Sequence, residues 1–305
     1  MSENYTKVAV VTGSSSGIGF ETCLEIGRNG FIVCATMRDT QKSKELEKKA
    51  EKEKISLKVY EMDVNHDFSV KNTISDIVKS YGRIDVVVNN AGYGLFGAVE
   101  DLSIQDIKSQ FETNVFGIIR VIQNVLPAMR MQCSGTIVNI SSLAGIAGFP
   151  SQSIYCGTKY AVEGISEALS YELGPLGIKV VLIEPGVINT EFVQDLVVPD
   201  FKYDINKNGK IIKNNESENQ KSSESLYNKT IAKFLEFYFN AMSKAPGPNL
   251  VATEILASYT KVNSKEYSGN LLRVPIGSDA TKYSKLKKDL SDTEFHNLIV
   301  DNLLK

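Results

Sequence analysis

The sequence predicts an α/β fold, with one doubly wound parallel sheet of about seven strands and helices on both faces. Short apolar, β-branched runs alternate along the chain with stretches of helical spacing, which is the pattern of repeated βαβ units. The first run leads directly into a glycine-rich turn, and small polar residues follow several later runs. Because parallel strands end at the same edge of a sheet, we expect these turns to meet there.

The length and composition fit one globular domain over residues 1–305. Hydrophobic residues make up 42% of the chain and charged residues 23%, which are ordinary values. The net charge of -2 gives no reason to expect nucleic acid or an anionic membrane as a partner. Four scattered cysteines and only two histidines predict no metal site. We expect a cytoplasmic protein without a stable membrane anchor, because we find no long apolar segment.

Seven runs are predicted as strands because they are short, apolar and rich in valine and isoleucine. In chain order they are residues 7–12, 30–36, 55–62, 84–88, 135–140, 178–184 and 271–276. Pro275 lies in the last run, and a proline is tolerated on an edge strand, so we place that strand on the edge side of the sheet.

The segments between these runs have helical spacing. They are residues 20–26, 41–54, 70–81, 104–126, 155–173, 226–242, 250–259, 282–288 and 295–304. Residues 41–54 are rich in lysine and glutamate and are predicted to be a solvated helix. Residues 104–126 are predicted as one long helix. A polar stretch followed by the aromatic helix 226–242 predicts a mobile substrate-lid insertion at about residues 195–245, although that helix is equally suited to packing on the core or a partner subunit.

The first turn has the pattern of a dinucleotide-binding Rossmann fold. Its glycines are spaced as Gly13-x-x-x-Gly17-x-Gly19, which differs from the usual Gly-x-Gly-x-x-Gly. Glycines let the backbone approach a pyrophosphate, and the start of the following helix offers free N–H groups. A plain connection between a strand and a helix is the alternative.

The end of the second strand bears on the choice of cofactor. An acidic residue there accepts from a ribose 2′-hydroxyl, whereas an arginine suits a 2′-phosphate. Alignment of the strand ends places Met37 at this position, followed by Arg38 and Asp39. Arg38, with the hydroxyl of Ser15, therefore predicts NADP(H) in preference to NAD(H). The alternative is that Arg38 only pairs with Asp39 on the surface.

Polar groups at other strand ends are expected around the same ligand. Asp63 and Val64 follow the third strand, where the carboxylate either accepts from an adenine amino group or starts a helix. After the fourth strand, Asn90-Ala91-Gly92 offers small polar groups and bare backbone near a ribose. Asn114 lies in the apolar middle of helix 104–126, where its amide needs partners and is interpreted as a structural contact or as the cause of a local break.

The chemistry is predicted from Ser142, Tyr155 and Lys159. Tyrosine and lysine four positions apart project from the same face of a helix. A neighbouring ammonium favours the phenolate, so we expect the pKa of Tyr155 to fall towards neutrality. A phenol of that kind exchanges a proton with an alcohol or a carbonyl oxygen. The Ser142 hydroxyl, at a strand end, is placed to steady the same oxygen.

Taken together, these motifs resemble the short-chain dehydrogenase/reductase family over nearly the whole chain. The resemblance rests on the glycine turn, Asn89-Asn90-Ala91-Gly92, Asn114, Ser142, Tyr155-x-x-x-Lys159, and Pro185-Gly186 with Thr190. Residues 35–39 and 272–280 are similar to those of the branch that holds hydroxysteroid dehydrogenases, retinol dehydrogenases and carbonyl reductases. The insertion departs from that branch where the substrate is selected, so the steroid or retinol label is not carried over.

The resemblance implies an NADP(H)-dependent oxidoreductase that interconverts a carbonyl and an alcohol on an apolar substrate. Tyr155 would be the proton donor or acceptor, Lys159 would lower its pKa, Ser142 would orient the substrate, and Asn114 would hold a water of the proton relay. The implied cofactor contacts are Gly13, Ser15, Gly17, Ile18, Gly19, Arg38, Asp63, Val64, Asn90, Ala91, Gly92, Tyr155, Lys159, Pro185, Gly186, Val187 and Thr190.

The resemblance also implies a homodimer or homotetramer that assembles through the helices after Gly92 and around Tyr155. Three alternatives are an NAD-dependent alcohol dehydrogenase of the same fold, a non-catalytic dinucleotide-binding sensor, and an enzyme that works at a membrane surface. The intact set of Ser142, Tyr155 and Lys159 argues against the sensor, because a binding protein has no use for an activated phenol. The aromatic helix lacks the basic face that strong membrane anchoring needs.

Overall fold

The predicted doubly wound parallel sheet is present. The computed structural model describes residues 5–193, 196–198 and 225–305. Its seven strands pair in parallel in the order β3-β2-β1-β4-β5-β6-β7. The strands are β1 (Val8–Thr12), β2 (Ile32–Met37), β3 (Leu57–Glu61), β4 (Val86–Asn89), β5 (Gly135–Ile140), β6 (Ile178–Pro185) and β7 (Leu271–Ile276). As predicted, β7, with Pro275, is an edge strand.

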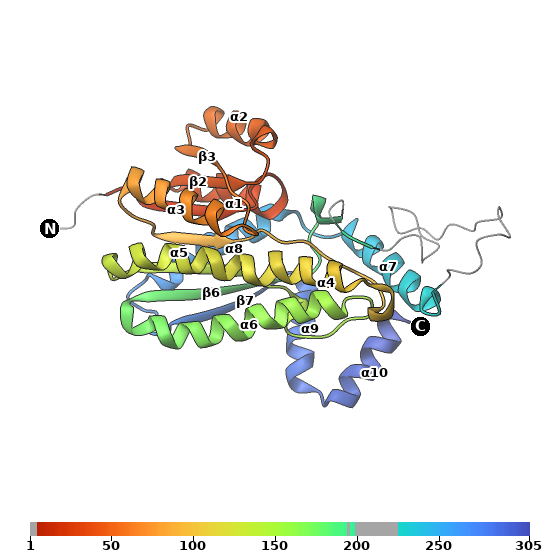
Figure 1. Ribbon diagram of the computed structural model, residues 1–305. Coiled ribbons are helices and arrows are strands. Elements are labelled where there is room, and N and C mark those ends of the chain that lie inside the picture. The colour runs from red at the N-terminus through yellow and green to blue at the C-terminus, as the bar shows by residue number, and fades with distance from the viewer. Residues whose placement is uncertain (1–4, 194–195, 199–224) are drawn as a thin grey trace.

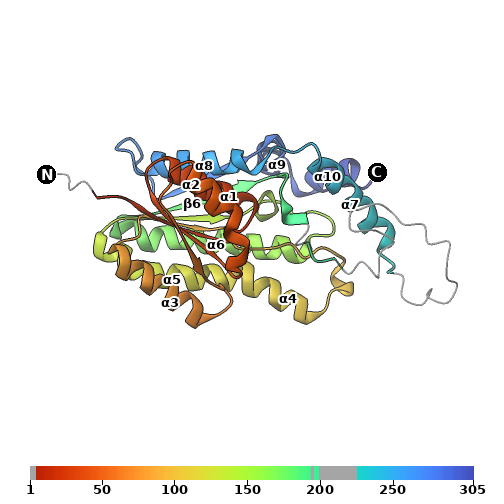
Figure 2. The ribbon, with the colours of Figure 1, turned by 90° about the horizontal axis from the view of Figure 1, so that it is seen from above.

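Helices cover both faces of this sheet (Figure 2). One face carries α1 (Gly17–Arg28), α2 (Lys44–Lys52) and α8 (Pro248–Val262). The other carries α3 (Asp67–Tyr81), α5 (Gly117–Gln132) and α6 (Ser153–Leu173). Successive side chains of a strand point to opposite faces, so β1 contributes Ala9 and Val11 to one apolar core and Val8 and Val10 to the other.

The order of the strands places a crevice at the carboxyl end of β1. This strand pairs with β2 on one side and with β4 on the other, so the connections that follow β1 and β4 diverge to opposite faces. A ligand site forms outside such a switch point, because the two turns separate there. The glycine turn after β1 and the Asn90 turn after β4 are therefore neighbours.

The helix predicted over residues 104–126 is present, and its middle turn is π-helical. The segment is divided into α4 (Ile104–Phe111), a π-helical turn (Glu112–Phe116) and α5. Asn114 lies in the π-helical turn, where its side chain is bonded to the backbone of Tyr93. The extra residue in that turn rotates Asn114 towards the neighbouring loop, and periodicity alone does not register a shift of one residue.

A third apolar cluster lies beyond the carboxyl ends of the strands. It joins the loop around Phe96 to α6, α7 (Asn228–Met242) and α10 (Asp292–Leu303), with α9 (Ser278–Asp289) beside it (Figure 1). Of the expected insertion at about residues 195–245, residues 195 and 199–224 lie outside the described part of the chain, and the described remainder is residues 196–198 and 225–245, which include α7. None of the helices in residues 5–193, 196–198 and 225–305 combines the length and apolarity that a bilayer span requires.

Candidate active site

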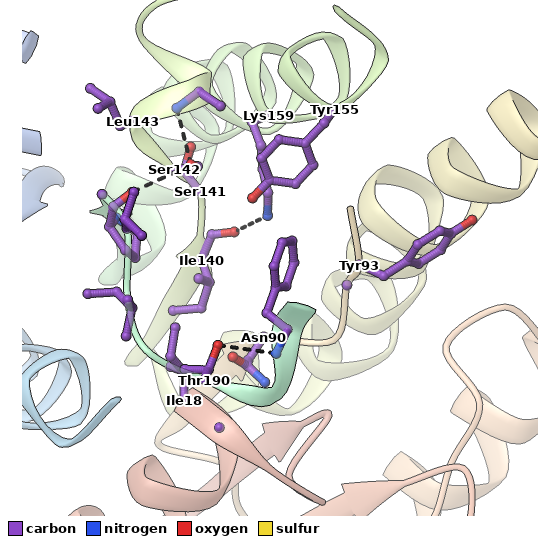
Figure 3. A pocket seen from close by; sticks show the side chains of 18 of the residues that line it. Ile18, Asn90, Tyr93, Ile140, Ser141, Ser142, Leu143, Tyr155, Lys159 and Thr190 are labelled. Carbon is purple, nitrogen blue, oxygen red and sulfur yellow. Dashed lines mark hydrogen bonds between the residues drawn. The ribbon is translucent and has the colours of Figure 1, made fainter. Parts of the chain in front are cut away.

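A cavity of about 680 Å³ lies at the carboxyl edge of the sheet (Figure 3). It extends from the glycine turn and Arg38 to the apolar cluster around α7 and α10. The predicted site residues that line it are Gly13, Ser15, Gly17, Ile18, Arg38, Asp63, Val64, Asn90, Ala91, Gly92, Ser142, Tyr155, Lys159, Pro185, Gly186, Val187 and Thr190. Gly19 and Asn114 lie behind this lining.

The glycine turn has the geometry that a dinucleotide requires. Gly13 and Gly17 have φ values of +64° and +55°, a backbone conformation that is unfavourable for residues with a side chain. A Cβ atom on Gly19 would lie 2.3 Å from the carbonyl oxygen of Gly13, so this position excludes any side chain. The N-cap Ser16 makes no side-chain hydrogen bond to α1, which leaves N–H groups of the first helical turn able to donate to a phosphate. The turn therefore fits a pyrophosphate.

The position of Arg38 is consistent with an open ribose pocket. Arg38 follows the buried Met37 at the end of β2 and is exposed at the cavity lining, and the partly buried Ser15 of the glycine turn lines the same cavity. The Oδ1 atom of Asp39 accepts a hydrogen bond of 3.0 Å from the Gln41 N–H, so this carboxylate caps the following turn. The guanidinium thus remains at the rim of the cavity.

Asn90 and Thr12 tie the two turns of the switch point together. The Asn90 side-chain amide donates to the carbonyl oxygens of Thr12 and Gly13, each at 3.0 Å. The Thr12 hydroxyl in turn accepts from the N–H groups of Asn90 and Ala91, each at 3.0 Å. These four bonds hold the floor of the cavity rigid, so Asn90 is a structural brace as well as a lining residue.

Asp63 has a helix-starting role in addition to its place in the lining. Its Oδ1 atom accepts from the Asn65 N–H at 3.0 Å in the turn before α3. His66 in the same turn is exposed. The neighbouring Val64 is buried against Gly117, where a Cβ atom would lie 2.9 Å from the Val64 methyl group. Both predicted residues therefore border the cavity on the side of α3 and α5.

Tyr155 and Lys159 project from one face of α6 into the cavity, as predicted (Figure 3). The two side chains are 9% and 7% exposed. The Lys159 Nζ atom donates to the carbonyl oxygen of Ile140 at 2.8 Å and lies 5.6 Å from the centre of the Tyr155 ring. Ser142 follows β5, and its hydroxyl accepts from the Ala144 N–H at 3.1 Å. The three functional groups thus share one wall of the cavity.

The expected fall of the Tyr155 pKa towards neutrality is contradicted by the structure. Burial raises the pKa of Tyr155 above its usual value, and the Ser142 hydroxyl only partly opposes this effect. Burial also lowers the pKa of Lys159 to about 8, against which the charge of Glu163 acts. The spacing of the two residues in the sequence predicts that they are neighbours, but it does not predict that both groups are desolvated.

Asn114 clamps the loop after β4. Its Oδ1 atom accepts from the Tyr93 N–H at 3.1 Å, and its Nδ2 atom donates to the Tyr93 carbonyl oxygen at 2.9 Å and to the Thr158 hydroxyl at 3.2 Å. The side chain is 1% exposed, so these partners satisfy a buried amide. The expected local break in the helix and the expected structural contact are both present.

The segment after β6 borders the cavity through Pro185, Gly186, Val187 and Thr190. Sequence reasoning missed Asp279, whose Oδ2 atom accepts from the Val187 N–H at 2.7 Å. Its carboxylate also fills the space above Gly186, where a Cβ atom would lie 2.1 Å from Oδ1. The Gly277-Ser278-Asp279 turn after the last strand was the available signal for this contact.

The substrate end of the cavity is formed mainly by aromatic side chains that sequence reasoning did not assign individually to the site. Phe96 is fully buried behind this lining, and its ring centre lies 5.8 Å from that of Tyr155 and 5.4 Å from that of Tyr238. The Phe192 ring centre lies 6.0 Å from that of Tyr155 on another side. Further apolar or aromatic lining residues are Phe149, Val197, Phe234, Phe237, Tyr283 and Leu303.

Comparisons with curated proteins give relatives of this catalytic region. The chain is 40% identical over 186 residues to the uncharacterized oxidoreductase YusZ of Bacillus subtilis. The aligned region covers 60% of this chain and 66% of that protein. It is 38% identical over 189 residues to a 3-ketodihydrosphingosine reductase of Bacteroides thetaiotaomicron, covering 62% and 66%. Human retinol dehydrogenase 8 is 40% identical over 190 residues, covering 61% and 60%. Each match thus spans slightly less than two thirds of the relative's own length.

Solved structures extend the similarity to nearly the whole chain. A short-chain dehydrogenase from Streptomyces avermitilis superposes with a TM-score of 0.77 at 28% identity over 97% of both chains. ElxO with NADP bound has a TM-score of 0.67 at 29% identity over 88% of this chain and 97% of its own. A Burkholderia phymatum enzyme in complex with NAD shares the fold, with a TM-score of 0.76 at 21% identity over 97% of both chains.

The family assignment rests on the region that contains the whole catalytic wall. The sequence profile of the short chain dehydrogenase family matches residues 7–199, which include the glycine turn, Ser142, Tyr155 and Lys159. The fold, the strand order and the position of these side chains agree with that match. The chain belongs to the short chain dehydrogenase family.

Proposed function

We propose that the protein is an NADP(H)-dependent oxidoreductase that interconverts a carbonyl and a primary or secondary alcohol on an apolar substrate of medium size. The observation that carries the proposal is the single cavity that joins the glycine turn to Ser142, Tyr155 and Lys159. A dinucleotide held at the turn would reach the catalytic wall without leaving the cavity. The bound cofactor supplies or accepts the hydride, and the protein supplies placement and the proton.

In this proposal Tyr155 is the general acid in reduction and the general base in oxidation. Ser142 lies on the same wall, where its hydroxyl donates to the substrate oxygen and orients it towards the phenol. A protonated Lys159 lowers the energy of the phenolate that remains after proton donation, because the two groups are buried together. Asn114, through its contacts with Tyr93 and Thr158, fixes the part of the site that would hold a relay water.

The aromatic end of the cavity supports an apolar substrate. Phe96, Phe234 and Tyr238 form a connected aromatic cluster beside Tyr155. Such a wall stabilises an apolar body by burying its surface, and it presents few polar groups for a sugar or a carboxylate. The 3-ketodihydrosphingosine reductase and the retinol dehydrogenase among the relatives are named for substrates with long apolar chains, which agrees with this class.

The choice of NADP(H) over NAD(H) follows from Arg38 at the end of β2, with Ser15 across the pocket. Solved relatives bind either cofactor, so an NAD-dependent alcohol dehydrogenase is the second candidate. Fluorescence titration of the purified protein distinguishes them: we expect tighter binding of NADPH than of NADH. Arg38→Asp should weaken NADPH binding by about tenfold or more, because it removes a charge-assisted contact to the 2′-phosphate. Equal NADPH affinity in the variant would refute this assignment.

We further propose a cytoplasmic homodimer or homotetramer. Buried thiols at Cys23 and Cys34 suit a reducing compartment. Ile104 on α4, Phe116 in the π-helical turn and Met131 on α5 are exposed apolar side chains that a partner subunit would cover. Light scattering of the purified protein gives the oligomer size.

Tyr155→Phe tests the enzymatic function against the sensor alternative. The experiment uses NADPH and a panel of apolar ketones and aldehydes, with oxidation of NADPH as the readout. The variant keeps the buried ring but lacks the proton, so we expect a rate loss of about 10²- to 10⁴-fold with little change in NADPH affinity. A sensor would lack activity in both proteins and retain binding in both. Full activity of the variant would exclude Tyr155 as the proton donor.

A further inference from the structure

Two carboxylates, one of them a single helical turn beyond Lys159, are buried beside an arginine whose side chain is 38% exposed. Glu163 on α6 and Glu184 on β6 are 8% and 2% exposed. The Arg273 Nε atom on β7 donates to the Glu163 Oε2 atom at 3.1 Å and lies 3.7 Å from the Glu184 Oε1 atom. In the described part of the chain, the Glu163 Oε1 atom has no hydrogen-bond partner. Burying two carboxylates beside one guanidinium is costly, which indicates a use beyond packing.

This cluster is in direct contact with the segment that holds Lys159. Glu163 is one helical turn beyond Lys159, on the same face of α6. Gly145 packs between them: a Cβ atom there would lie 3.0 Å from the Glu163 Cγ atom and 3.1 Å from the Lys159 carbonyl oxygen. The same Cβ atom would lie 2.6 Å from the Ser141 hydroxyl oxygen. Ser141 is the residue after Ile140, whose carbonyl oxygen accepts the hydrogen bond from Lys159. The Glu163 side chain and the backbone of Lys159 are therefore packed against the same glycine.

The pKa values of Lys159 and of the two carboxylates depend on burial and on each other's charges. Burial lowers the pKa of Lys159, and Glu163 is the group that raises it. Burial also raises the pKa of Glu163, and the Ser141 hydroxyl and Arg273 counteract this rise. The pKa of Glu184 is raised to about 7 by burial and by the charge of Glu163. The charged groups that face the two buried carboxylates are Lys159 on α6, Arg273 on β7 and Lys288 on α9, and Glu167 on α6 is paired with Arg273.

We propose that Glu163 is a positioning residue that keeps Lys159 protonated, and that Arg273 holds Glu163 ionised for this purpose. The proposal rests on the proposed function, in which Lys159 acts only as an ammonium. Glu163 itself touches neither substrate nor cofactor and acts through Lys159.

The test measures the protonation of Lys159 directly. The full-length protein is labelled with ¹³C at the lysine Cε positions, the Lys159 signal is assigned with Lys159→Met, and its chemical shift is followed against pH. We expect a midpoint near 8 in the natural protein. Glu163→Gln keeps the shape and removes the charge, so the midpoint should fall by about one pH unit or more. The matched control Glu167→Gln removes an exposed partner of Arg273 and should leave the midpoint unchanged.

Each outcome decides the proposal. An unchanged Lys159 midpoint in Glu163→Gln overturns it, and a lower melting temperature without a shifted midpoint shows that the cluster is only a structural tie. If Glu163→Gln does not fold, Glu163→Asp replaces it: the carboxylate is drawn back by one methylene, so a smaller downward shift is expected and no shift overturns the proposal. In carbonyl reduction, the alkaline limb of the pH profile should move in the same direction as the midpoint. A protein without such activity that still shows the shifted midpoint would refute the proposed function and leave this inference intact.

Discussion

The two ends of the cavity are built in different ways. The cofactor end consists mainly of backbone and small side chains at the ends of β1 and β4, held by hydrogen bonds from Thr12 and Asn90. The substrate end consists of large rings carried by the Phe96 loop, α6 and α7. A turn that depends on backbone geometry tolerates few residue types, whereas an aromatic wall tolerates many. The first end is therefore specified locally and the second by packing between distant segments.

The difference implies that the two ends fail differently. Truncation of a ring at the substrate end leaves a cavity in the core, so its main cost falls on stability. Addition of a single carbon at the cofactor end displaces backbone, so its main cost falls on cofactor binding. Substitutions at each end, compared in the same two assays, test this separation.

Phe96→Ala is expected to have the largest effect on stability. The ring is fully buried and contacts Tyr155, Phe234 and Tyr238, so its removal should lower the free energy of unfolding by about 3–5 kcal/mol. Urea unfolding followed by circular dichroism measures this. The control Phe68→Ala removes a ring that is 79% exposed on α3, and should change the free energy by less than about 0.5 kcal/mol.

Equal effects of the two substitutions would contradict the packing of the substrate end. NADPH affinity of the folded Phe96→Ala protein should stay close to that of the natural protein, because the ring lies away from the glycine turn. A large loss of affinity with unchanged stability would remove the distinction between the two ends.

The same contrast explains what the sequence alone predicts. The parallel sheet, the edge position of β7 and the lining residues from Gly13 to Thr190 follow from local patterns, because a glycine turn or a Tyr-x-x-x-Lys pair carries its own geometry. Phe96 shows the limit of this reasoning. Its three aromatic partners come from α6 and α7, far along the chain.

Two features that local spacing does not specify have the same physical origin. The π-helical turn around Asn114 is set by hydrogen bonds to Tyr93 and Thr158, which lie outside its own helix. The pKa of Tyr155 is raised by burial next to Phe96 and Phe192, and this burial cannot be predicted from the spacing between Tyr155 and Lys159. In both cases the property belongs to a contact between elements that are distant in sequence.

Gly19→Ala is expected to have a smaller effect, confined to the cofactor end. Its Cβ atom would lie 2.3 Å from the Gly13 carbonyl oxygen and 2.6 Å from the Asn90 amide, and neither group has room to move. Overpacking of this kind costs about 1–3 kcal/mol. If this free energy is lost from cofactor binding, the NADPH affinity falls by roughly tenfold to a hundredfold, which a fluorescence titration measures.

The matched control for Gly19→Ala is Gly164→Ala on α6, where a Cβ atom would meet nothing within 4 Å. That substitution should leave NADPH affinity unchanged and raise stability slightly, by up to about 1 kcal/mol, because alanine favours a helix over glycine. If Gly19→Ala bound NADPH as tightly as the control, the turn would yield to a side chain. The cofactor end would then be as adaptable as the aromatic wall, since its close backbone contacts would no longer determine what binds.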